Sequence, residues 1–204
     1  MSTTSTAAIA SYVTDMSALE EHLEKALAGQ LADIENDPVT TEALREVHGT
    51  IQRHIATLDA LADRRKEAGQ GIAENLKKAA TAVLGAGAAA IDFVRTEKLP
   101  KNLRDDYTAV SMACIGYVML HTTALSLGDA EVADVAHRHL QNHARNVMTL
   151  HNIIPAVVIR FLQEEGLPAS ANVLPTIAKN IESVWKGEDV PSADDVAFAG
   201  SRPS

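Results

Sequence analysis

The chain has 204 residues, of which 46% are hydrophobic and 22% are charged, and its formal net charge at pH 7 is -9. This length and composition predict one globular domain with a packed core. The acidic balance argues against a nucleic-acid-binding surface, which needs a basic face, and an aromatic content of 3% disfavours an all-β sandwich. Cys114 is the single cysteine, so an internal disulfide and a thiolate zinc site are excluded.

The first residues lack the basic and apolar regions of a secretory signal. The most apolar stretch, residues 79–91, is shorter than the roughly 20 residues that a membrane-spanning helix needs. Together with the lone cysteine, these features lead us to expect a soluble, cytoplasmic protein in a reducing compartment.

Apolar residues at spacings of three and four predict a helix over residues 7–35 and a second over residues 38–66. Asp37 is expected to cap the second helix, with Pro38 at its first position. An alanine-rich segment, residues 72–95, predicts a further helix that packs along the bundle or contacts another copy. Its Gly85–Ala90 run superficially matches a dinucleotide-binding fingerprint, but it follows a helical pattern and not a strand, so we reject that interpretation.

The next helix is expected to start with Asn102 as its cap and to end at the turn formed by Gly128 and Asp129. A long helix over residues 130–165 follows, then a short one over residues 175–186 and a polar tail. No segment alternates like a strand. The sequence therefore predicts an all-α four-helix bundle over residues 1–168, with the alanine-rich helix added, and a short helix with its tail over residues 169–204.

Several polar side chains fall on the apolar stripes, where burial costs a few kcal/mol each unless they find a partner. The bundle interior is a common place for metal ions, and two histidines four residues apart project from one helix face. His22, His54, His137 and His151 lie off the stripes and are predicted to lie on the surface. The polar residues predicted to face the core are Glu20, His48, Tyr117, His121, His139 and His143.

The chain resembles the bacterial stress-associated ferritin-like proteins typified by YciE and YciF. The resemblance covers residues 7–165 and rests on three stretches: Asp15-Met-Ser-Ala-Leu-Glu-Glu-His-Leu23, Leu44-Arg-Glu-Val-His-Gly-Thr-Ile51, and Tyr117 to Gly128 with the long helix after it. It implies a ferritin-like four-helix bundle. In such bundles two helices each supply a Glu and two others each supply a Glu-x-x-His motif to a pair of metal ions.

The expected ligands are mostly missing from this sequence. Glu20 and His48 match the first-helix Glu and the second-helix His that the resemblance implies, but Arg45 stands where the acid before His48 is expected. A carboxylate-bridged di-iron site needs roughly four carboxylates, and one survives. We therefore expect either no cofactor or one divalent transition metal, held by Glu20 with His48, His121, His139 and His143.

Three functions remain open from the sequence. The first is a non-catalytic, stress-linked or structural bundle protein with a degenerate metal site. The second is a mononuclear metal-binding protein or oxidase with an imidazole-rich site. A hemerythrin-like oxygen carrier is disfavoured, because the other helices lack the His-x-x-x-Glu pattern. We expect a homo-oligomer with no nucleic-acid or membrane partner, and a polar layer in which Glu20 accepts hydrogen bonds from His48 and His143.

Overall fold

The computed structural model describes residues 3–34, 37–67 and 98–187, and every regular element in these ranges is helical. The prediction of an all-α helical bundle is confirmed. The predicted alanine-rich helix over residues 72–95 and the tail after residue 187 lie outside the described residues. The elements are α1 (Thr3–Asp33), α2 (Pro38–Glu67), α4 (Lys98–Ser126), α5 (Ala130–Glu164), the short 3-10 helix η2 (Ala171–Val173) and α6 (Leu174–Lys186).

The chain divides into two compact units at Val157, so the division falls inside α5. The first unit contains α1, α2, α4 and most of α5. The second contains the end of α5, η2 and α6, and Gly187, which caps α6 after Lys186, has a left-handed φ of 72°. The candidate site described below lies entirely in the first unit.

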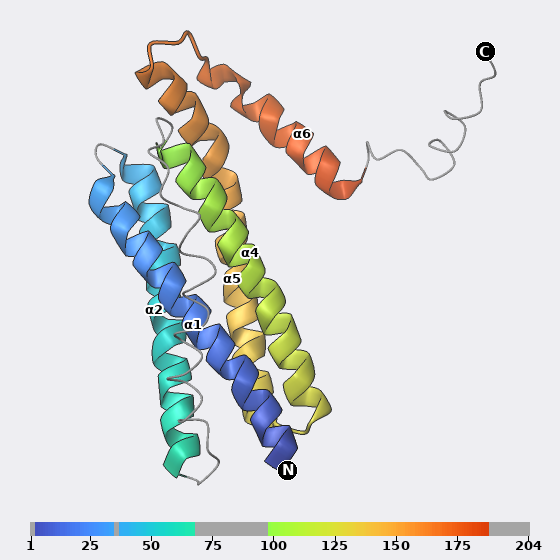
Figure 1. The fold of residues 1–204 in the computed structure, drawn as a ribbon. Helices are drawn as coiled ribbons and strands as arrows, with labels where there is room; N and C mark the ends of the chain where they lie inside the picture. The colour runs from blue at the N-terminus through green and yellow to red at the C-terminus, as the bar shows by residue number, and fades with distance from the viewer. Residues whose placement is uncertain (1–2, 35–36, 68–97, 188–204) are drawn as a thin grey trace, which may run out of the picture. The chain divides into compact units, whose positions relative to one another are not determined.

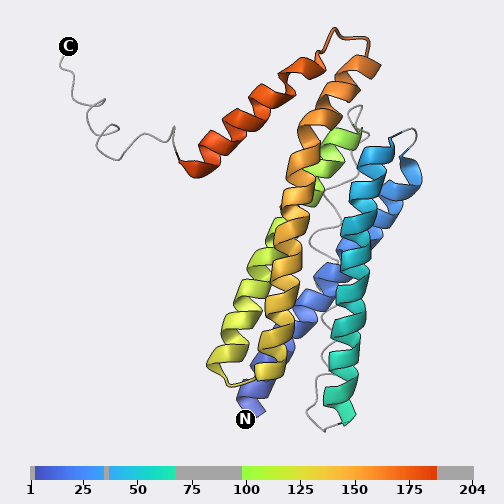
Figure 2. The same cartoon turned by 180° about the vertical axis from the view of Figure 1, so that it is seen from behind.

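The four long helices form a bundle in which sequence neighbours are not always antiparallel (Figure 1). α1 packs against both α2 and α4. α1 and α5 run in one direction and α2 and α4 in the other, and the view from behind shows α5 on the side opposite α1 (Figure 2). This order is the topology of four-helix bundles with one long crossover connection. It places α1 and α5 on one diagonal of the bundle, and α2 and α4 on the other.

The turn between α1 and α2 has the predicted chemistry. The backbone N–H of Thr40 donates to Asp37 Oδ1 at 3.0 Å, so Asp37 caps α2 and Pro38 occupies its first position. The predicted cap at Asn102 is wrong, because α4 already begins at Lys98. Pro100 lies in the first turn of α4, where its missing N–H costs nothing.

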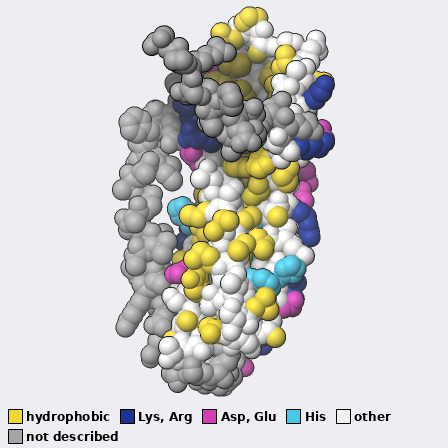
Figure 3. Space-filling view, turned by 90° about the vertical axis from the view of Figure 1, so that its right-hand side faces the viewer, with side chains coloured by type: hydrophobic (Ala, Val, Ile, Leu, Met, Phe, Trp, Pro, Cys, Tyr) yellow, Lys and Arg dark blue, Asp and Glu magenta, His cyan; other side chains and the backbone are white. Residues whose placement is uncertain are grey.

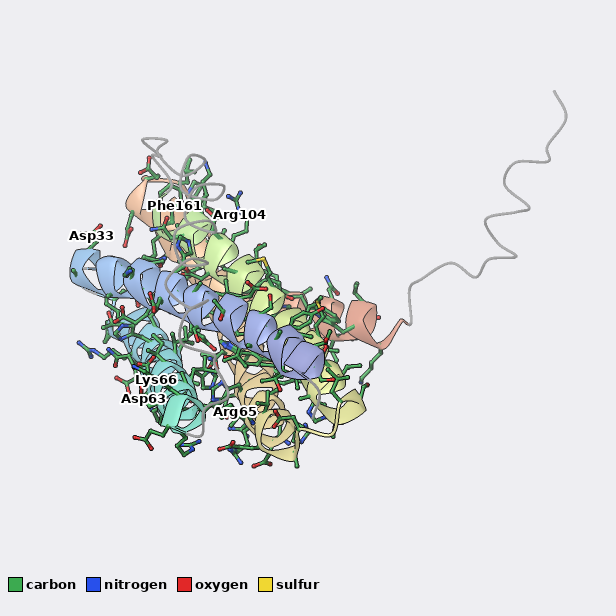
Figure 4. All side chains as sticks on the ribbon, turned by 60° about the horizontal axis from the view of Figure 1, so that its bottom comes forward. Asp33, Asp63, Arg65, Lys66, Arg104 and Phe161 are labelled. Carbon is green, nitrogen blue, oxygen red and sulfur yellow. The ribbon has the colours of Figure 1, made fainter. Side chains whose placement is uncertain are left out.

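The turn between α4 and α5 also forms as predicted. Gly128 has a φ of 76°, which an L side chain rarely adopts, and the Val132 backbone N–H donates to Asp129 Oδ1 at 3.2 Å. The two terminal guanidinium nitrogens of Arg65 also donate to the two carboxylate oxygens of Asp129, at 2.5 and 2.6 Å, in a buried ion pair. Arg65 projects from α2 toward α5, whereas Lys66 lies on the outer side (Figure 4). This ion pair therefore joins the end of α2 to the start of α5.

The buried face of α2 differs from the prediction at two turns. His48, expected to face the core, and Ile55 are half-buried, whereas Val47 and His54, each one position earlier, are buried. From Ile51 onward the buried residues are spaced three, four, three and four apart, as in a helix that packs along its length against partners. The buried residues of α2 from Leu44 onward are Leu44, Val47, Thr50, Ile51, His54, Leu58, Leu61 and Arg65.

The inward face of α4 contains Tyr117, as predicted, together with Leu120 and Ala124, which are fully buried, whereas Leu125 is 59% exposed. Among the described residues, one segment, Leu99–Ser126 of α4, is long enough and apolar enough to cross a membrane by length and composition. A core helix of a bundle meets the same criteria.

Candidate metal centre

A cluster of polar side chains lies in the bundle interior, where the four long helices meet. α1 contributes Glu20, α2 contributes His54, α4 contributes Tyr117, and α5 contributes His139 and His143. Each of the five is at most 3% exposed. Because α1 and α5 are diagonal partners, the contact between Glu20 and His143 crosses the centre of the bundle.

Three hydrogen-bonding groups converge on a single oxygen of Glu20. Oε1 lies 2.9 Å from His54 Nδ1 and 2.8 Å from His143 Nε2, and those two nitrogens are 3.3 Å apart. The Tyr117 hydroxyl donates to the same oxygen at 2.6 Å. The other oxygen, Oε2, is buried and has no hydrogen-bond partner. Of the two carboxylate oxygens, Oε1 thus has three hydrogen-bonding neighbours and Oε2 has none.

A second ring of contacts orients these groups. His139 Nδ1 lies 2.9 Å from the Tyr117 oxygen, so it donates to the hydroxyl that in turn donates to Glu20. The His139 ring stacks on His54 with centroids 3.8 Å apart and an interplanar angle of 11°. The Asn142 amide nitrogen lies 3.1 Å from His54 Nε2. His54 is therefore fixed both in its plane and at its outer nitrogen.

Burial and hydrogen bonding set the charges of the cluster. Burial alone would raise the pKa of Glu20, but hydrogen bonds from His143 and His54 outweigh it and lower this pKa from 4.5 to about 2. Burial lowers the pKa of His54, and it lowers the pKa of His139 to about 3. Burial and the neighbouring carboxylate raise the pKa of Tyr117 well above 10. At pH 7 the site holds an ionised carboxylate beside a neutral phenol and neutral His54 and His139 rings.

The proton positions within this arrangement conflict. If Asn142 donates to His54 Nε2, the proton of the neutral His54 ring must sit on Nδ1. His143 must also carry a proton on Nε2 to donate to Glu20, so two N–H groups face one another at 3.3 Å. The opposite nitrogen of His143, Nδ1, is buried with no partner. The clash between the facing N–H groups is relieved if both rings turn lone pairs toward a cation, with the His54 proton on Nε2 and the Asn142 amide turned so that its oxygen accepts that proton.

The three converging atoms have the dimensions of a metal-ligand face. The ligand atoms of Glu20, His54 and His143 lie within 4.8 Å of one another, and all three residues are buried. Four ligands placed 2.0–2.1 Å from zinc would be about 3.3 Å apart, close to the observed 2.8, 2.9 and 3.3 Å. Two imidazoles with one carboxylate are also a ligand set that zinc and non-haem iron use in proteins.

The structure brings together only part of the set predicted from sequence. Glu20 and His143 are in contact, and His139 reaches Glu20 through Tyr117. His48 instead pairs with Glu24 at 2.9 Å, with its side chain 17% exposed. The expected hydrogen bond from His48 to Glu20 is therefore wrong.

His121 lies outside the cluster and His54 lies inside it. The His121 ring is half-buried and donates from Nδ1 to the Ala133 carbonyl at 2.8 Å. His54 was predicted to lie on the surface, and this prediction is wrong, because His54 is 2% exposed. Distance along the sequence from the turn at Asp37 could have predicted the burial of His54. Glu20 and His54 both lie seventeen residues from Asp37, so an antiparallel pair of helices places them opposite one another.

Comparisons with known proteins give a likeness of fold. No family model and no curated protein matches the chain. The crystal structure of a protein from Xanthomonas campestris pv. campestris is similar, with a TM-score of 0.62 and 20% sequence identity. The match covers 80% of this chain and 99% of that protein. The helical fold is thus shared with a solved bacterial protein.

Proposed function

We propose that this protein binds one divalent transition-metal ion in the interior of its helical bundle, with Glu20, His54 and His143 as ligands. The single observation that carries the proposal is the convergence of these three ligand atoms, at 2.8 to 3.3 Å from one another, in a fully buried site. Buried charged groups in proteins are paired or bind metals, and Glu20 has no Lys or Arg among its hydrogen-bond and ion-pair partners in the described residues.

The donor set favours a particular class of ion. Imidazole nitrogen suits zinc, copper, nickel and iron, whereas magnesium and calcium prefer oxygen ligands. One carboxylate neutralises only half of a divalent charge, so the site is suited to one ion and not to a bridged pair. With its amide turned, Asn142 would accept the outer N–H of His54 through Oδ1, which fixes the ring for ligation. We take zinc as the probe ion for these reasons.

A second candidate function is a metal-free structural bundle. The observation that favours it is the hydroxyl of Tyr117, which already completes a hydrogen-bonded chain from His139 to Glu20. In that case the protein is a degenerate member of the ferritin-like, stress-linked class that the sequence resembles, acting in the cytoplasm as a homo-oligomer. The bare Oε2 of Glu20 and the two N–H groups of His54 and His143 that face one another at 3.3 Å weigh against it.

Thermal unfolding with and without zinc tests the proposal. A ligand that binds only the folded state stabilises it by about 2.7 kcal/mol at one hundred times its dissociation constant. We expect zinc to raise the melting temperature of the wild type and of His48→Ala, but not of His54→Ala. His48 is a matched control, because it is a histidine on the same helix that pairs with Glu24 outside the cluster. Equal zinc shifts in all three proteins would contradict the proposal.

A further inference from the structure

The outer face of α4 is apolar and carries no charge. Between Asp106 and Asp129 the sequence contains no Asp, Glu, Lys or Arg. Five large apolar side chains of this stretch are between 43% and 62% exposed, and Figure 3 shows hydrophobic side chains gathering along this side of the molecule. They are Met112, Ile115, Val118, Met119 and Leu125.

Neighbouring positions extend this α4 face. Thr122 is exposed, and its hydroxyl donates to the Val118 carbonyl at 2.8 Å, so its polar group is satisfied within the helix. On α5, His137 lies beside α4, because its ring is 5.3 Å from that of His121. Met148 lies on the same helical stripe as His137, three turns along, and is 49% exposed. Contiguous exposed apolar surface of this kind marks an interaction site.

The pattern of the α4 face is self-complementary. An isologous contact about a two-fold axis needs a surface in which each residue faces a suitable partner from an identical copy. If two α4 helices cross antiparallel with the axis between Val118 and Met119, every exposed apolar position meets another position of the same face. The matched pairs are Met112 with Leu125, Ile115 with Thr122, and Val118 with Met119, flanked by Ser111 with Ser126.

Charge also favours a second copy as the occupant. Each chain carries a formal charge of -9, so two copies repel one another wherever acidic surfaces meet. The α4 face offers contact without opposing carboxylates. A membrane is a poorer fit, because helices that bind lipid surfaces carry Lys and Arg beside their apolar face, and this stretch has none.

We propose that the outer face of α4 is a two-fold homodimer interface, in which α4 packs antiparallel against α4 of a second copy. A standard interface buries about 800 Å² on each partner. The exposed apolar residues of α4 form its dry centre, and His121, His137 and Ser111 lie toward its polar rim. This interface is independent of the metal centre, since none of its residues touches Glu20, His54 or His143 through a described hydrogen bond.

Sedimentation equilibrium with charge variants tests the interface. Val118→Glu places two carboxylates next to the two-fold axis, so we expect a monomer that keeps the helical circular dichroism spectrum of the wild type and still melts cooperatively. Val39→Glu is the matched control, because Val39 is 65% exposed on α2, away from this face, and the variant should remain a dimer. A wild type that stays monomeric, or a Val118→Glu variant that stays dimeric, overturns the proposal.

Cysteine cross-linking tests the register. In a Cys114→Ser background, the double variant Ile115→Cys/Thr122→Cys should form disulfide-linked dimers under oxidation, while either cysteine alone should not. The two positions lie on one stripe, about 10 Å apart along the helix, so they face the partner and cannot bridge within a chain. Cross-linking by the single variants to the same extent contradicts the antiparallel register. A monomer that binds phosphatidylglycerol vesicles, and loses that binding in Val118→Glu, assigns the face to a membrane and overturns the proposal.

Discussion

Replacing Glu20 with glutamine in the metal-free protein removes one buried charge and keeps the side-chain shape. Glu20 is fully buried and accepts hydrogen bonds from Tyr117, His54 and His143. Its pKa is lowered from 4.5 to about 2, and each pKa unit corresponds to about 1.4 kcal/mol. The ionised carboxylate therefore contributes about 3 kcal/mol to the free energy of unfolding at pH 7, a large share of the 5–15 kcal/mol that is usual for a domain.

The sign of the effect fixes its pH dependence. A carboxylate with a lowered pKa stabilises the fold above its unfolded pKa of 4.5, and this contribution is lost as the pH falls toward 2. Glutamine does not titrate. The difference in the free energy of unfolding between the wild type and Glu20→Gln should therefore be about 3 kcal/mol at pH 7 and should shrink below pH 4.5.

Urea unfolding followed by circular dichroism, in the presence of a chelator, measures this difference. Glu24→Gln is the matched control, because Glu24 lies one turn away and pairs with His48 in a contact that solvent reaches, so its loss should cost less than about 1 kcal/mol. A Glu20→Gln variant as stable as the wild type at pH 7, or a difference that stays constant between pH 7 and pH 3, would refute the reasoning.

Three further predictions concern the same interior. Tyr117→Phe removes the donor to Glu20 and leaves His139 Nδ1 without its acceptor, so it should cost about 1–3 kcal/mol in urea unfolding yet leave zinc binding intact. The pKa values of His54 and His139 are lowered in the folded protein, so as the pH falls these rings take up protons in the unfolded chain first. The free energy of unfolding should therefore fall from pH 6.5 toward pH 3, and His139→Gln should reduce that slope. Burial raises the pKa of Asp106 to about 7 despite a hydrogen bond from Gln30, so the charged form of Asp106 opposes folding at higher pH. Asp106→Asn should therefore raise the melting temperature at pH 8 and change it little at pH 4.

The helices and their turns were predictable because local chemistry determines them. Asp37 with Pro38, and Gly128 with Asp129, each stop one helix and start the next, and the structure places both turns there. Asn102 failed as a predicted cap because Pro100 can lie inside the first turn of a helix, so the break at the proline was not the helix start.

The ligand set was only partly predictable because two stripes on α2 fit the helical period. The stripe with His48 and the stripe with His54 share Leu44, Ile51, Leu58 and Leu61, and they differ only by one position at two turns. Which of the two is buried depends on where α1 and α5 lie, and spacing along one helix does not contain that information. Counting residues from the turns does contain it: Tyr117 and His139 are each eleven residues from Gly128, and they pair in the structure.

Elemental analysis of untagged protein, loaded with zinc and then desalted, tests the central claim most directly. Three converging ligand atoms from Glu20, His54 and His143 predict one zinc ion per chain in the wild type and in His48→Ala, and loss of that ion in His54→Ala. Protein that retains no zinc while melting cooperatively would contradict the metal centre and leave the cluster as a hydrogen-bonded core. Two ions per chain would contradict the mononuclear site.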